Sequence, residues 1–369
     1  MSPMPRVLIA FAAALVVAVA VAPAAQARVP EHFFGAMWDR EATKAPEAEQ
    51  DAQWALMAQS GVKTVRTVFW WSRAQFTPGQ PFDFDETDRI VARAARHDLN
   101  LLPLVMNTPE WARLVPGEFG SPPERVSDYT AYLRALVLRY GPAGSFWDEH
   151  PELPRRPQRE WQIWNEPHLN FYWSTKGRGK NAWVPEYARL LKASKQTIKA
   201  IDPGATIVLA GLADFAWDHL DHLNRFKIRR LFDVAALNLF TGRPRLLIKG
   251  VYKFRRALRR GREGRKPLWV TETTWPAGKG RVPVPDPLWQ RAWYTTDSGM
   301  ASRLRGAYRL GARFSARLRI GRMYWYTWSS AYRDGDLFDY TGLNRYQGGE
   351  FEPRPALAAY SAVARRLGR

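Results

Sequence analysis

The feature that most constrains the fold of this 369-residue chain is a regular alternation of short apolar runs with helical patterns. Eight runs have the length and the β-branched or aromatic content of buried strands. They are Phe33–Trp38, Val62–Trp70, Leu99–Asn107, Glu160–Asn165, Thr206–Gly211, Phe232–Phe240, Pro267–Glu272 and Arg322–Trp328. Strands that alternate with helices form parallel βαβ units, and eight such units predict an α/β fold, a (β/α)8 TIM barrel.

The helical stretches between these strands carry boundary signals of their own. Asp85 is expected to cap a helix that runs to Asp98, and Ser127 to cap one that ends at Gly141. A further helix is expected from Pro185 to Ile201. A doubly wound open sheet is the alternative, but no glycine-rich phosphate loop follows an early strand. Residues 28–369 are therefore expected to form a single barrel domain.

The N-terminal segment has the pattern of a signal peptide. Arg6 is followed by an apolar run from Val7 to Ala22, and Ala25-Gln26-Ala27 is a small-x-small cleavage site. We therefore expect residues 1–27 to be removed and the mature chain to be secreted, with no stable membrane span. The sequence has no Cys, which excludes disulfides and thiolate metal sites, and export without Cys suits a bacterial host.

Polar and aromatic side chains gather where the predicted strands end. These residues are Arg66, Trp70, Asn107, Asn165, Glu166, Asn238, Glu272, Trp325 and Trp328. A single one could be a loop residue that makes a local cap. Barrel enzymes build their sites at the C-terminal ends of the strands, so the repetition on six strands predicts an active site there.

Two of these residues are carboxylates, and their spacing is informative. Glu166 and Glu272 lie 106 residues apart, which fits the fourth and seventh strands of a barrel that spends about 31 residues per unit. Two carboxylates that flank one point are what glycoside hydrolysis needs. Glu166 lies among aromatic residues, which raise a carboxyl pKa, so it is the expected acid/base. Glu272 lies between Thr271 and Thr273 and is the expected ionised nucleophile.

With these residues in view, the chain resembles the retaining glycoside hydrolases of clan A, especially the cellulase-like and β-xylosidase-like families 5 and 39. The segments "IWNEP" (163–167), "WVTETTWP" (269–276) and "RMYWYTWSS" (322–330) carry the resemblance. It implies Glu166 as acid/base, Glu272 as nucleophile, Asn165 on the sugar 2-hydroxyl and Arg66 as support for the nucleophile. It also implies that the eighth-strand aromatics, Trp325 and Trp328, floor the sugar site.

The sequence departs from that family pattern at two places. His168 follows the proline where many relatives carry Asn, and Asn238-Leu239-Phe240 ends the sixth strand where many place a His or Tyr. Both positions are kept as candidate substrate contacts. The two departures leave open which group orients Glu272 and which sugar is bound.

The sequence supports other functions less well than a glycosidase. His219 and His222 share a polar helix face with two Asp, but without a third clear ligand they favour no metal site. No cofactor is expected. A non-catalytic glycan-binding barrel is the alternative function, because the 17 Trp would also serve binding.

The chain is strongly basic, with a formal net charge of +20. The segment Arg243–Lys266 holds eleven Lys or Arg and one acid, Glu263. Such a block is either a solvated helix or a contact for an acidic or cell-wall glycan. No nucleic-acid motif accompanies it, so no nucleic-acid partner is expected.

Overall fold

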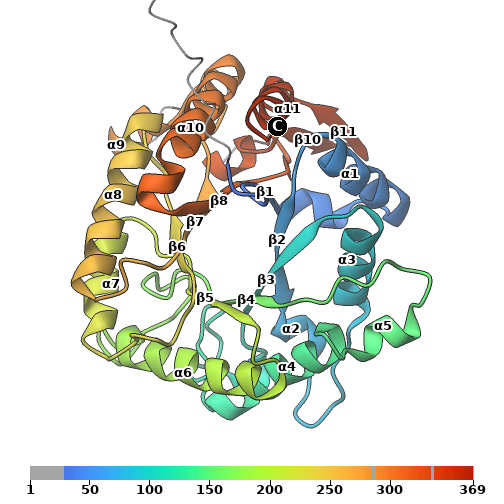
Figure 1. Ribbon diagram of the computed structural model, residues 1–369, viewed down its shortest axis with the longest axis vertical. Helices are drawn as coiled ribbons and strands as arrows, with labels where there is room; N and C mark the ends of the chain where they lie inside the picture. Colours follow the sequence, from blue (N-terminus) through green and yellow to red (C-terminus); the bar gives the residue numbers. More distant parts are fainter. Residues whose placement is uncertain (1–28, 284–287, 334–335, 369) are drawn as a thin grey trace, which may run out of the picture.

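The computed structural model describes residues 29–283, 288–333 and 336–368, and these form a barrel of eight parallel strands inside a ring of helices (Figure 1). The strands are β1 (Phe34–Trp38), β2 (Thr64–Trp70), β3 (Asn100–Met106), β4 (Glu160–Ile163), β5 (Thr206–Val208), β6 (Ala235–Asn238), β7 (Leu268–Thr273) and β8 (Ile320–Trp325). The (β/α)8 fold predicted from the alternating pattern is thereby confirmed, with each strand inside or next to its expected range.

The strands follow one another in the order β5-β4-β3-β2-β1-β8-β7-β6, and every pair in this sheet is parallel. Isolated parallel bridges, Val208 with Val234 and Leu212 with Leu237, join β5 to β6. The N–H of Leu209 also donates to the carbonyl of Val234 at 3.0 Å. These contacts close the barrel, so the C-terminal ends of all eight strands surround one mouth.

Helices cover the outside of the barrel between successive strands. The long ones are α1 (Glu47–Gln59), α3 (Asp85–Arg96), α4 (Val126–Tyr140), α6 (Trp183–Ile201), α7 (Ala216–Asn224), α8 (Pro244–Arg260), α10 (Asp297–Leu318) and α11 (Pro355–Leu367). Shorter ones are α2 (Trp71–Ala74), α5 (Ser145–Glu149), α9 (Leu288–Trp293), η1 (Arg40–Lys44), η2 (Glu110–Ala112) and η3 (Leu337–Tyr340). A small sheet of β9 (Ser329–Ser330), β10 (Asn344–Gln347) and β11 (Glu350–Pro353) lies between β8 and α11.

Alternation along the strands divides the core into two parts. Side chains of one parity fill the barrel, where a cluster of six is fully or almost fully buried: Leu102, Val208, Val234, Ala236, Trp269 and Tyr324. Side chains of the other parity meet the helices. The buried face of α4 includes Leu133, Leu136 and Tyr140, which recur at the spacing of one side of an α-helix. Each such side chain stabilises the fold by about 1.5–3 kcal/mol.

An ion pair between a buried arginine and a half-buried glutamate lies at the N-terminal end of the barrel. Arg322 of β8 donates from Nη2 to Oε1 of Glu160 of β4 at 2.6 Å, and its guanidinium lies 4.0 Å from the ring centroid of Trp269. The charge of each partner is satisfied inside the barrel. This end therefore acts as a polar floor, and the functional polar groups lie at the other end.

Three helix starts differ from those expected. Asp85 is the first residue of α3 and not its cap, and the carboxylate of Asp83 accepts the Asp85 N–H at 2.8 Å. The helix α4 begins at Val126, one residue before Ser127, and α6 begins at Trp183, two residues before Pro185. Each difference stays within the first turn, where several residues can satisfy the free N–H groups.

The predicted signal peptide, residues 1–27, lies outside the described residues. Within the described part of the chain, no helix combines the length and the apolar character needed to cross a bilayer.

Candidate active site

Polar side chains from four strands meet at the mouth of the barrel. Arg66 comes from β2, Asn165 and Glu166 follow β4, Asn238 ends β6, and Glu272 lies in β7. All five are at most 7% exposed. The sequence placed all five near strand ends, whereas Arg66 is the third residue of the seven-residue strand β2. The closed barrel brings all five into one hydrogen-bonded group.

Arg66 holds Glu272 in place. Its Nη1 donates to Oε1 of Glu272 at 2.6 Å, its Nε to Oε1 of Gln162 at 2.6 Å, and its Nη2 to Oδ1 of Asn165 at 2.9 Å. The side chain is fully buried. A planar guanidinium with three fixed acceptors cannot turn, so the carboxylate that it binds is fixed as well.

Asn238 holds Glu166 in the same way. Its Nδ2 donates to Oε1 of Glu166 at 2.7 Å and to Oδ1 of Asn165 at 3.2 Å. Its own amide oxygen accepts the hydroxyl of Thr271 at 2.7 Å, which fixes the orientation of the amide. A continuous chain of contacts thus runs from Glu272 through Arg66, Asn165 and Asn238 to Glu166.

The backbone after β4 is bent to present Glu166. Trp164 and Glu166 both have positive φ angles, 66° and 41°, which residues other than glycine rarely adopt. The Glu166 N–H donates to the carbonyl of Gly211 at 3.0 Å, and the Trp164 indole donates to the carbonyl of Tyr172 at 2.8 Å. These contacts hold a strained turn of the kind that clusters at functional sites.

The two glutamates experience different electrostatic surroundings. Burial raises the pKa of Glu166 well above its ordinary value, the negative charge of Glu272 raises it further, and the Asn238 hydrogen bond opposes the shift. Burial also raises the pKa of Glu272, but the charge of Arg66 and its hydrogen bond pull it back. The proton is therefore held on Glu166, and the charge is stabilised on Glu272.

Three further residues at the mouth, Asp39, Tyr172 and Tyr326, are not among the contacts predicted from the sequence. Asp39 follows β1 and accepts the hydroxyl of Thr327, and its charge raises the pKa of Glu272. Tyr172 and Tyr326 are half-buried. Burial raises the pKa of both phenols. Carboxylates raise it further, Glu166 and Glu272 for Tyr172 and Asp39 and Glu272 for Tyr326. Of the three, Tyr326 carried a signal in the sequence, because it follows Tyr324 by two residues and so has the same parity along the strand.

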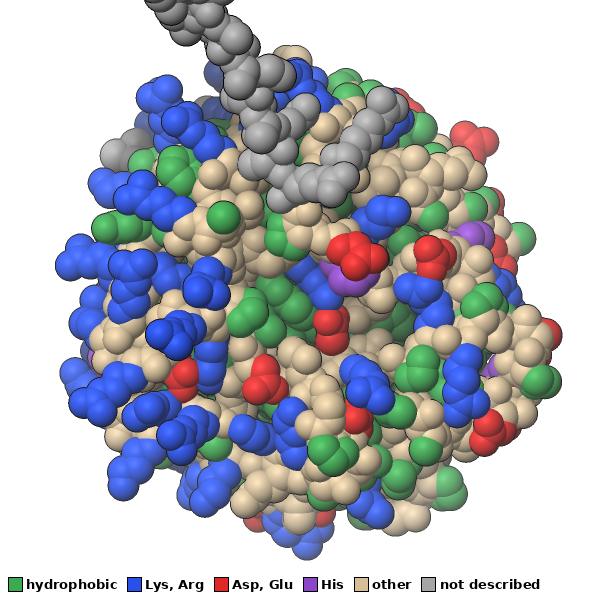
Figure 2. Space-filling model, in the orientation of Figure 1, with side chains coloured by type: hydrophobic (Ala, Val, Ile, Leu, Met, Phe, Trp, Pro, Cys, Tyr) green, Lys and Arg blue, Asp and Glu red, His purple; other side chains and the backbone are tan. Residues whose placement is uncertain are grey.

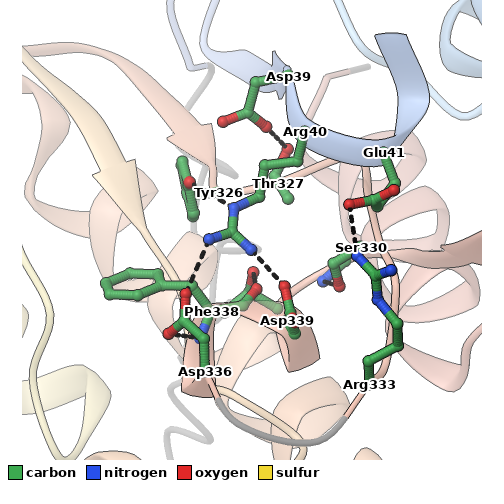
Figure 3. A network of polar contacts seen from close by, with 12 residues as sticks. Asp39, Arg40, Glu41, Tyr326, Thr327, Ser330, Arg333, Asp336, Phe338 and Asp339 are labelled. Atoms are coloured by element: carbon green, nitrogen blue, oxygen red, sulfur yellow. Dashed lines mark hydrogen bonds and ion pairs between the residues drawn. The ribbon is translucent and has the colours of Figure 1, made fainter. Parts of the chain in front are cut away.

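Arg40 ties the wall of the mouth together (Figure 3). Its Nε donates to the hydroxyl of Tyr326 at 3.1 Å, its Nη1 to Asp339 at 2.7 Å and its Nη2 to Asp336 at 3.0 Å. Asp336 and Asp339 belong to the segment after β9, so Arg40 fastens that segment to the end of β1. Because Tyr326 is the third acceptor, its ring is held at the mouth.

The expectation that Trp325 and Trp328 floor the sugar site is wrong. Both are fully buried, and their indole N–H groups donate to Thr341 O at 3.0 Å and Gln53 Oε1 at 2.9 Å. Tyr324 points into the barrel, so the alternation turns Trp325 towards the helices. The aromatic ring that returns to the mouth from this segment is that of Tyr326.

Two other candidate contacts, Trp70 and Asn107, have different neighbours. Trp70 lies under the guanidinium of Arg73, at 4.9 Å, and lines a surface cavity with Tyr132. Asn107 is buried and donates to the carbonyl of Phe119 at 3.4 Å, which supports the loop after β3. Neither is placed in the group of contacts around the two glutamates.

His168 lies in a cluster of rings beside the acid/base loop. It stacks on His219 with ring centroids 4.1 Å apart and meets Trp183 edge-on at 6.2 Å. Burial lowers the pKa of His168 to about 3, so the ring is neutral. Among the described residues, no group of three or more His, Asp or Glu is arranged to hold a metal ion.

An exposed aromatic pair lies on the loops next to Glu166. Phe119 is 48% exposed and Phe171 66%, with ring centroids 5.8 Å apart. Gly120 lets the two loops touch, because a Cβ there would lie 2.1 Å from the carbonyl oxygen of Phe171. Phe171 also meets Tyr172 edge-on at 4.9 Å, so aromatic rings continue from the carboxylates to the rim.

No family model matches the sequence, and no curated protein matches it. Solved structures do match its fold. A family 39 glycoside hydrolase from Bacteroides cellulosilyticus aligns with a TM-score of 0.61 at 17% identity, over 93% of this chain and 65% of that one. A monomeric β-xylosidase from Caulobacter crescentus gives 0.63 at 17% identity, over 91% of this chain and 68% of that one.

A family 1 β-glucosidase from Thermotoga maritima matches over almost its whole length. Its TM-score is 0.64 at 10% identity, over 93% of this chain and 99% of that one. The chain thus spans 65% of the first of these three proteins and nearly all of the third. The resemblance to clan A glycoside hydrolases is confirmed at the level of the barrel fold.

Proposed function

We propose that the chain is a retaining glycoside hydrolase that cleaves O-glycosidic bonds of an oligo- or polysaccharide. The observation that carries the proposal is the continuous set of contacts from Glu272 through Arg66, Asn165 and Asn238 to Glu166. It fixes one ionised and one protonated carboxyl at the mouth of the barrel, which is the pair that this reaction needs. The glycosidase barrels of similar fold support the same reaction class.

In the first step, a carboxylate oxygen of Glu272 attacks the anomeric carbon and the bond to the leaving oxygen breaks. Glu166 gives its proton to that oxygen, so the leaving group departs as an alcohol. A covalent ester then joins the sugar to Glu272. The fork of Arg66 keeps the attacking carboxylate ionised and aimed, because it contributes both charge and a hydrogen bond.

In the second step, water attacks the anomeric carbon, Glu166 takes a proton from it, and the ester bond to Glu272 breaks. The charge of Glu272 raises the pKa of Glu166 in the free enzyme. Ester formation removes that charge, so the pKa of Glu166 falls when it must act as a base. Two inversions at one carbon retain its configuration.

Asn165 is assigned to the sugar 2-hydroxyl. Its amide oxygen already accepts from Arg66 at 2.9 Å and from Asn238 at 3.2 Å. The NH2 group of the same amide is therefore the end that remains for the substrate. A hydrogen bond to the 2-hydroxyl that strengthens in the transition state lowers the barrier.

The substrate sugar is proposed to be neutral. Asp39 and Glu272 contribute carboxylates at the mouth, and the neighbouring guanidinium groups, Arg66 and Arg40, are already held by acceptors. A sugar carboxylate would meet this negative charge beside cations that are already paired. Hydroxyl groups, in contrast, can donate to these carboxylates.

The exposed pair Phe119–Phe171 is proposed to contact the leaving group. The leaving oxygen must lie within hydrogen-bond reach of Glu166, and Phe171 follows Glu166 in the same loop. Flat aromatic rings bind the C–H faces of sugar rings and apolar leaving groups.

The test is a panel of aryl glycosides and polysaccharides with the wild type, Glu166→Ala and Glu272→Ala. We expect hydrolysis by the wild type, retained configuration in the first product seen by NMR, and loss of activity in both variants. Azide should rescue Glu272→Ala and give a glycosyl azide of inverted configuration. A wild type that binds glycans but hydrolyses nothing in the panel would instead indicate a non-catalytic glycan-binding barrel.

Export to the extracellular space is also proposed, on the signal-peptide pattern of residues 1–27. The test is expression of the full chain in a bacterial host and N-terminal sequencing of the protein in the medium. We expect Arg28 as the first residue. Recovery of the intact N-terminus in the cell or the membrane would contradict export.

A further inference from the structure

Two neighbouring surface hollows, together named the basic hollow, are lined mostly by cations. The first has a volume of about 590 Å³ and lies between the segment after α7 and the end of α8. Its cations are Lys227, Arg229, Arg230, Arg260 and Arg262. The second, of about 400 Å³, shares Arg262 and adds Arg259, Arg265 and Lys266. The remaining lining residues are Asn224, Gly261, Glu263 and Gly264.

Most of this charge is not neutralised by the protein. Glu263, the one acid of the lining, accepts the Arg230 N–H at 2.8 Å and pairs with Lys266 at 3.0 Å. Arg260 pairs with Asp221. The other six cations are exposed, and none forms an ion pair with a carboxylate of the described chain: Lys227, Arg229, Arg230, Arg259, Arg262 and Arg265. Like charges held together without a counter-charge repel one another and destabilise the folded state. A bound anion would remove this repulsion.

Three of these cations stand where the backbone favours glycine. Lys227, Arg230 and Arg262 have φ angles of 58°, 68° and 59°. Arg262 ends α8 in a capping turn, in which the Glu263 N–H donates to the Leu258 carbonyl at 2.7 Å. Glycine is the usual residue at such a position because a side chain strains the left-handed backbone. Long cationic side chains at all three positions, in place of glycine, indicate that their charge has a function.

The basic hollow lies at the end of the barrel opposite the glutamates. Its two segments precede β6 and β7, whereas Asn238 and Glu272 lie at the far ends of those strands. The charge continues up the side of the barrel on α10, which packs against α8 and carries Arg305, Arg309, Arg313 and Arg317 at four-residue spacing. Figure 2 shows Lys and Arg side chains crowded on the side where Figure 1 has α7 and α8.

We infer that the basic hollow binds a linear anionic polysaccharide, one that carries sulfate or carboxylate groups along the chain. The inference does not depend on the proposed hydrolase activity. Arginine forks bind both oxyanions through paired hydrogen bonds, and a row of them suits charges that repeat along a polymer. Since the proposed reaction takes a neutral sugar at the opposite end, the bound polymer would anchor the protein and would not be cleaved there.

The lining of the basic hollow favours a polysaccharide over other polyanions. A membrane surface is bound by cations with apolar side chains beside them, whereas the lining of these hollows consists of polar residues and glycine. Single-stranded nucleic acid is bound with aromatic rings that stack on its bases, and no lining residue of the hollows is aromatic.

The test compares the wild type with the triple variant Lys227→Gly, Arg230→Gly, Arg262→Gly. The matched control is Arg134→Gln, Arg189→Gln, Lys192→Gln, which removes three exposed cations from α4 and α6. Binding to heparin, polygalacturonate and neutral dextran is measured over a range of NaCl concentrations. Duplex DNA and anionic phospholipid vesicles are the further probes. Melting temperatures report folding, and we expect that of the glycine variant to equal or exceed that of the wild type.

We expect the wild type to bind heparin or polygalacturonate, but not dextran, at about 150 mM NaCl. The glycine variant should lower the salt dependence of binding by about three ion contacts, and the control should leave it unchanged. Equal loss in the two variants, absence of binding, or tighter binding to DNA or vesicles would each overturn the inference. Hydrolysis of a small glycoside should not change in the glycine variant, so failure of this inference and failure of the hydrolase proposal are separable.

Discussion

At the scale of single residues, the arrangement of the mouth depends on Arg66. This side chain is fully buried and meets three acceptors on two strands, Glu272, Gln162 and Asn165. A buried cation is stable only when it is paired, and here the pairing also orients a reacting group. The folded structure of the mouth and the proposed reaction therefore both require Arg66.

Arg66→Lys is expected to lower kcat/KM at least about 100-fold, because an ammonium cannot hold three acceptors and aim Glu272. The melting temperature should also fall, since buried acceptors left without donors cost about 1–3 kcal/mol each. Arg73→Lys, at an exposed guanidinium over Trp70, is the control and should change neither. Kinetics on the best panel substrate and thermal denaturation check both parts. Equal activity of Arg66→Lys and wild type would contradict the role.

Relative to the wild type, Glu166→Gln is expected to become more stable as the pH rises. A carboxyl with a higher pKa in the folded than in the unfolded protein binds more protons when folded. The stability that this carboxyl contributes is therefore complete below its pKa in the unfolded protein, about 4.3. This stability is lost as the pH rises through its higher pKa in the folded protein. Gln has no proton to lose. The difference in melting temperature between Glu166→Gln and the wild type should grow from about pH 4 to pH 8.

The control for this experiment is Glu124→Gln, which removes a carboxyl from an exposed position. A difference in melting temperature for Glu166→Gln that does not exceed that of the control at any pH would show that burial does not raise the pKa of Glu166, and would remove the physical basis of its assignment as the acid.

At the scale of elements, the seam between β5 and β6 positions the acid/base. Gly211 follows β5, accepts the Glu166 N–H and lies against Asn238, so that a Cβ at this position would be 2.5 Å from the Asn238 amide oxygen. The strand ends thus meet closely enough for one amide to reach both Glu166 and Asn165. A side chain larger than hydrogen would separate them.

Gly211→Ala is expected to displace Asn238 and to act like Asn238→Ala. Hydrogen bonds from Asn238 lower the pKa of both Glu166 and Glu272, so their loss raises both. The acid limb of the pH profile, where Glu272 ionises, and the alkaline limb, where Glu166 loses its proton, should both move to higher pH. The profile of kcat/KM measures this. A downward shift, or a shift in only one of the two variants, would show that Asn238 does not couple the pair.

The loops after β3 and β4 form the second functional element, and their exposed rings predict a leaving-group effect. Phe119→Ala and Phe171→Ala should raise KM for oligosaccharides and large aryl glycosides about 5- to 30-fold, the effect of losing about 1–2 kcal/mol of aromatic contact. Glycosyl fluorides, whose leaving group is a single atom, should be unaffected. Phe215→Ala removes an equally exposed ring from the loop after β5 and is the control. Equal effects on glycosyl fluorides and oligosaccharides would show that Phe119 and Phe171 do not contact the leaving group.

At the scale of the whole molecule, the distribution of charge is uneven. The chain has a net charge of +20, yet Asp39, Glu166 and Glu272 meet at the mouth beside two arginines that are already paired. The cations gather instead on α8, α10 and the basic hollow. One end of the barrel thus suits hydroxyl groups, and the other suits anions.

This distribution predicts selectivity between sugars. A neutral hexoside should be cleaved with a kcat/KM at least about 100-fold higher than the hexuronide with the same linkage and leaving group, because like charges at a buried site cost several kcal/mol. Raising the salt concentration should change neither rate much, since the charges lie close together in a buried site. Preferred cleavage of the hexuronide would show that a cation near the mouth is available to the substrate.

Sequence alone determined the barrel and the two glutamates that define its mouth. The alternation of short apolar runs with helical patterns and the spacing from Glu166 to Glu272 are local or nearly local properties, so they can be recognised without knowledge of the contacts. The same pattern placed Asn238 at a strand end. The pattern could in addition have indicated Tyr326, which follows the inward-facing Tyr324 by two residues.

Tertiary structure alone decided which of these groups touch and which aromatic rings face the mouth. Trp325 and Trp328 look like sugar platforms in the sequence, but packing against segments far along the chain buries them completely. Asp39 and Tyr172 reach the site from opposite sides of the barrel. Burial and neighbouring charge, which set the proton on Glu166, arise only when the barrel closes, because both depend on contacts between distant strands.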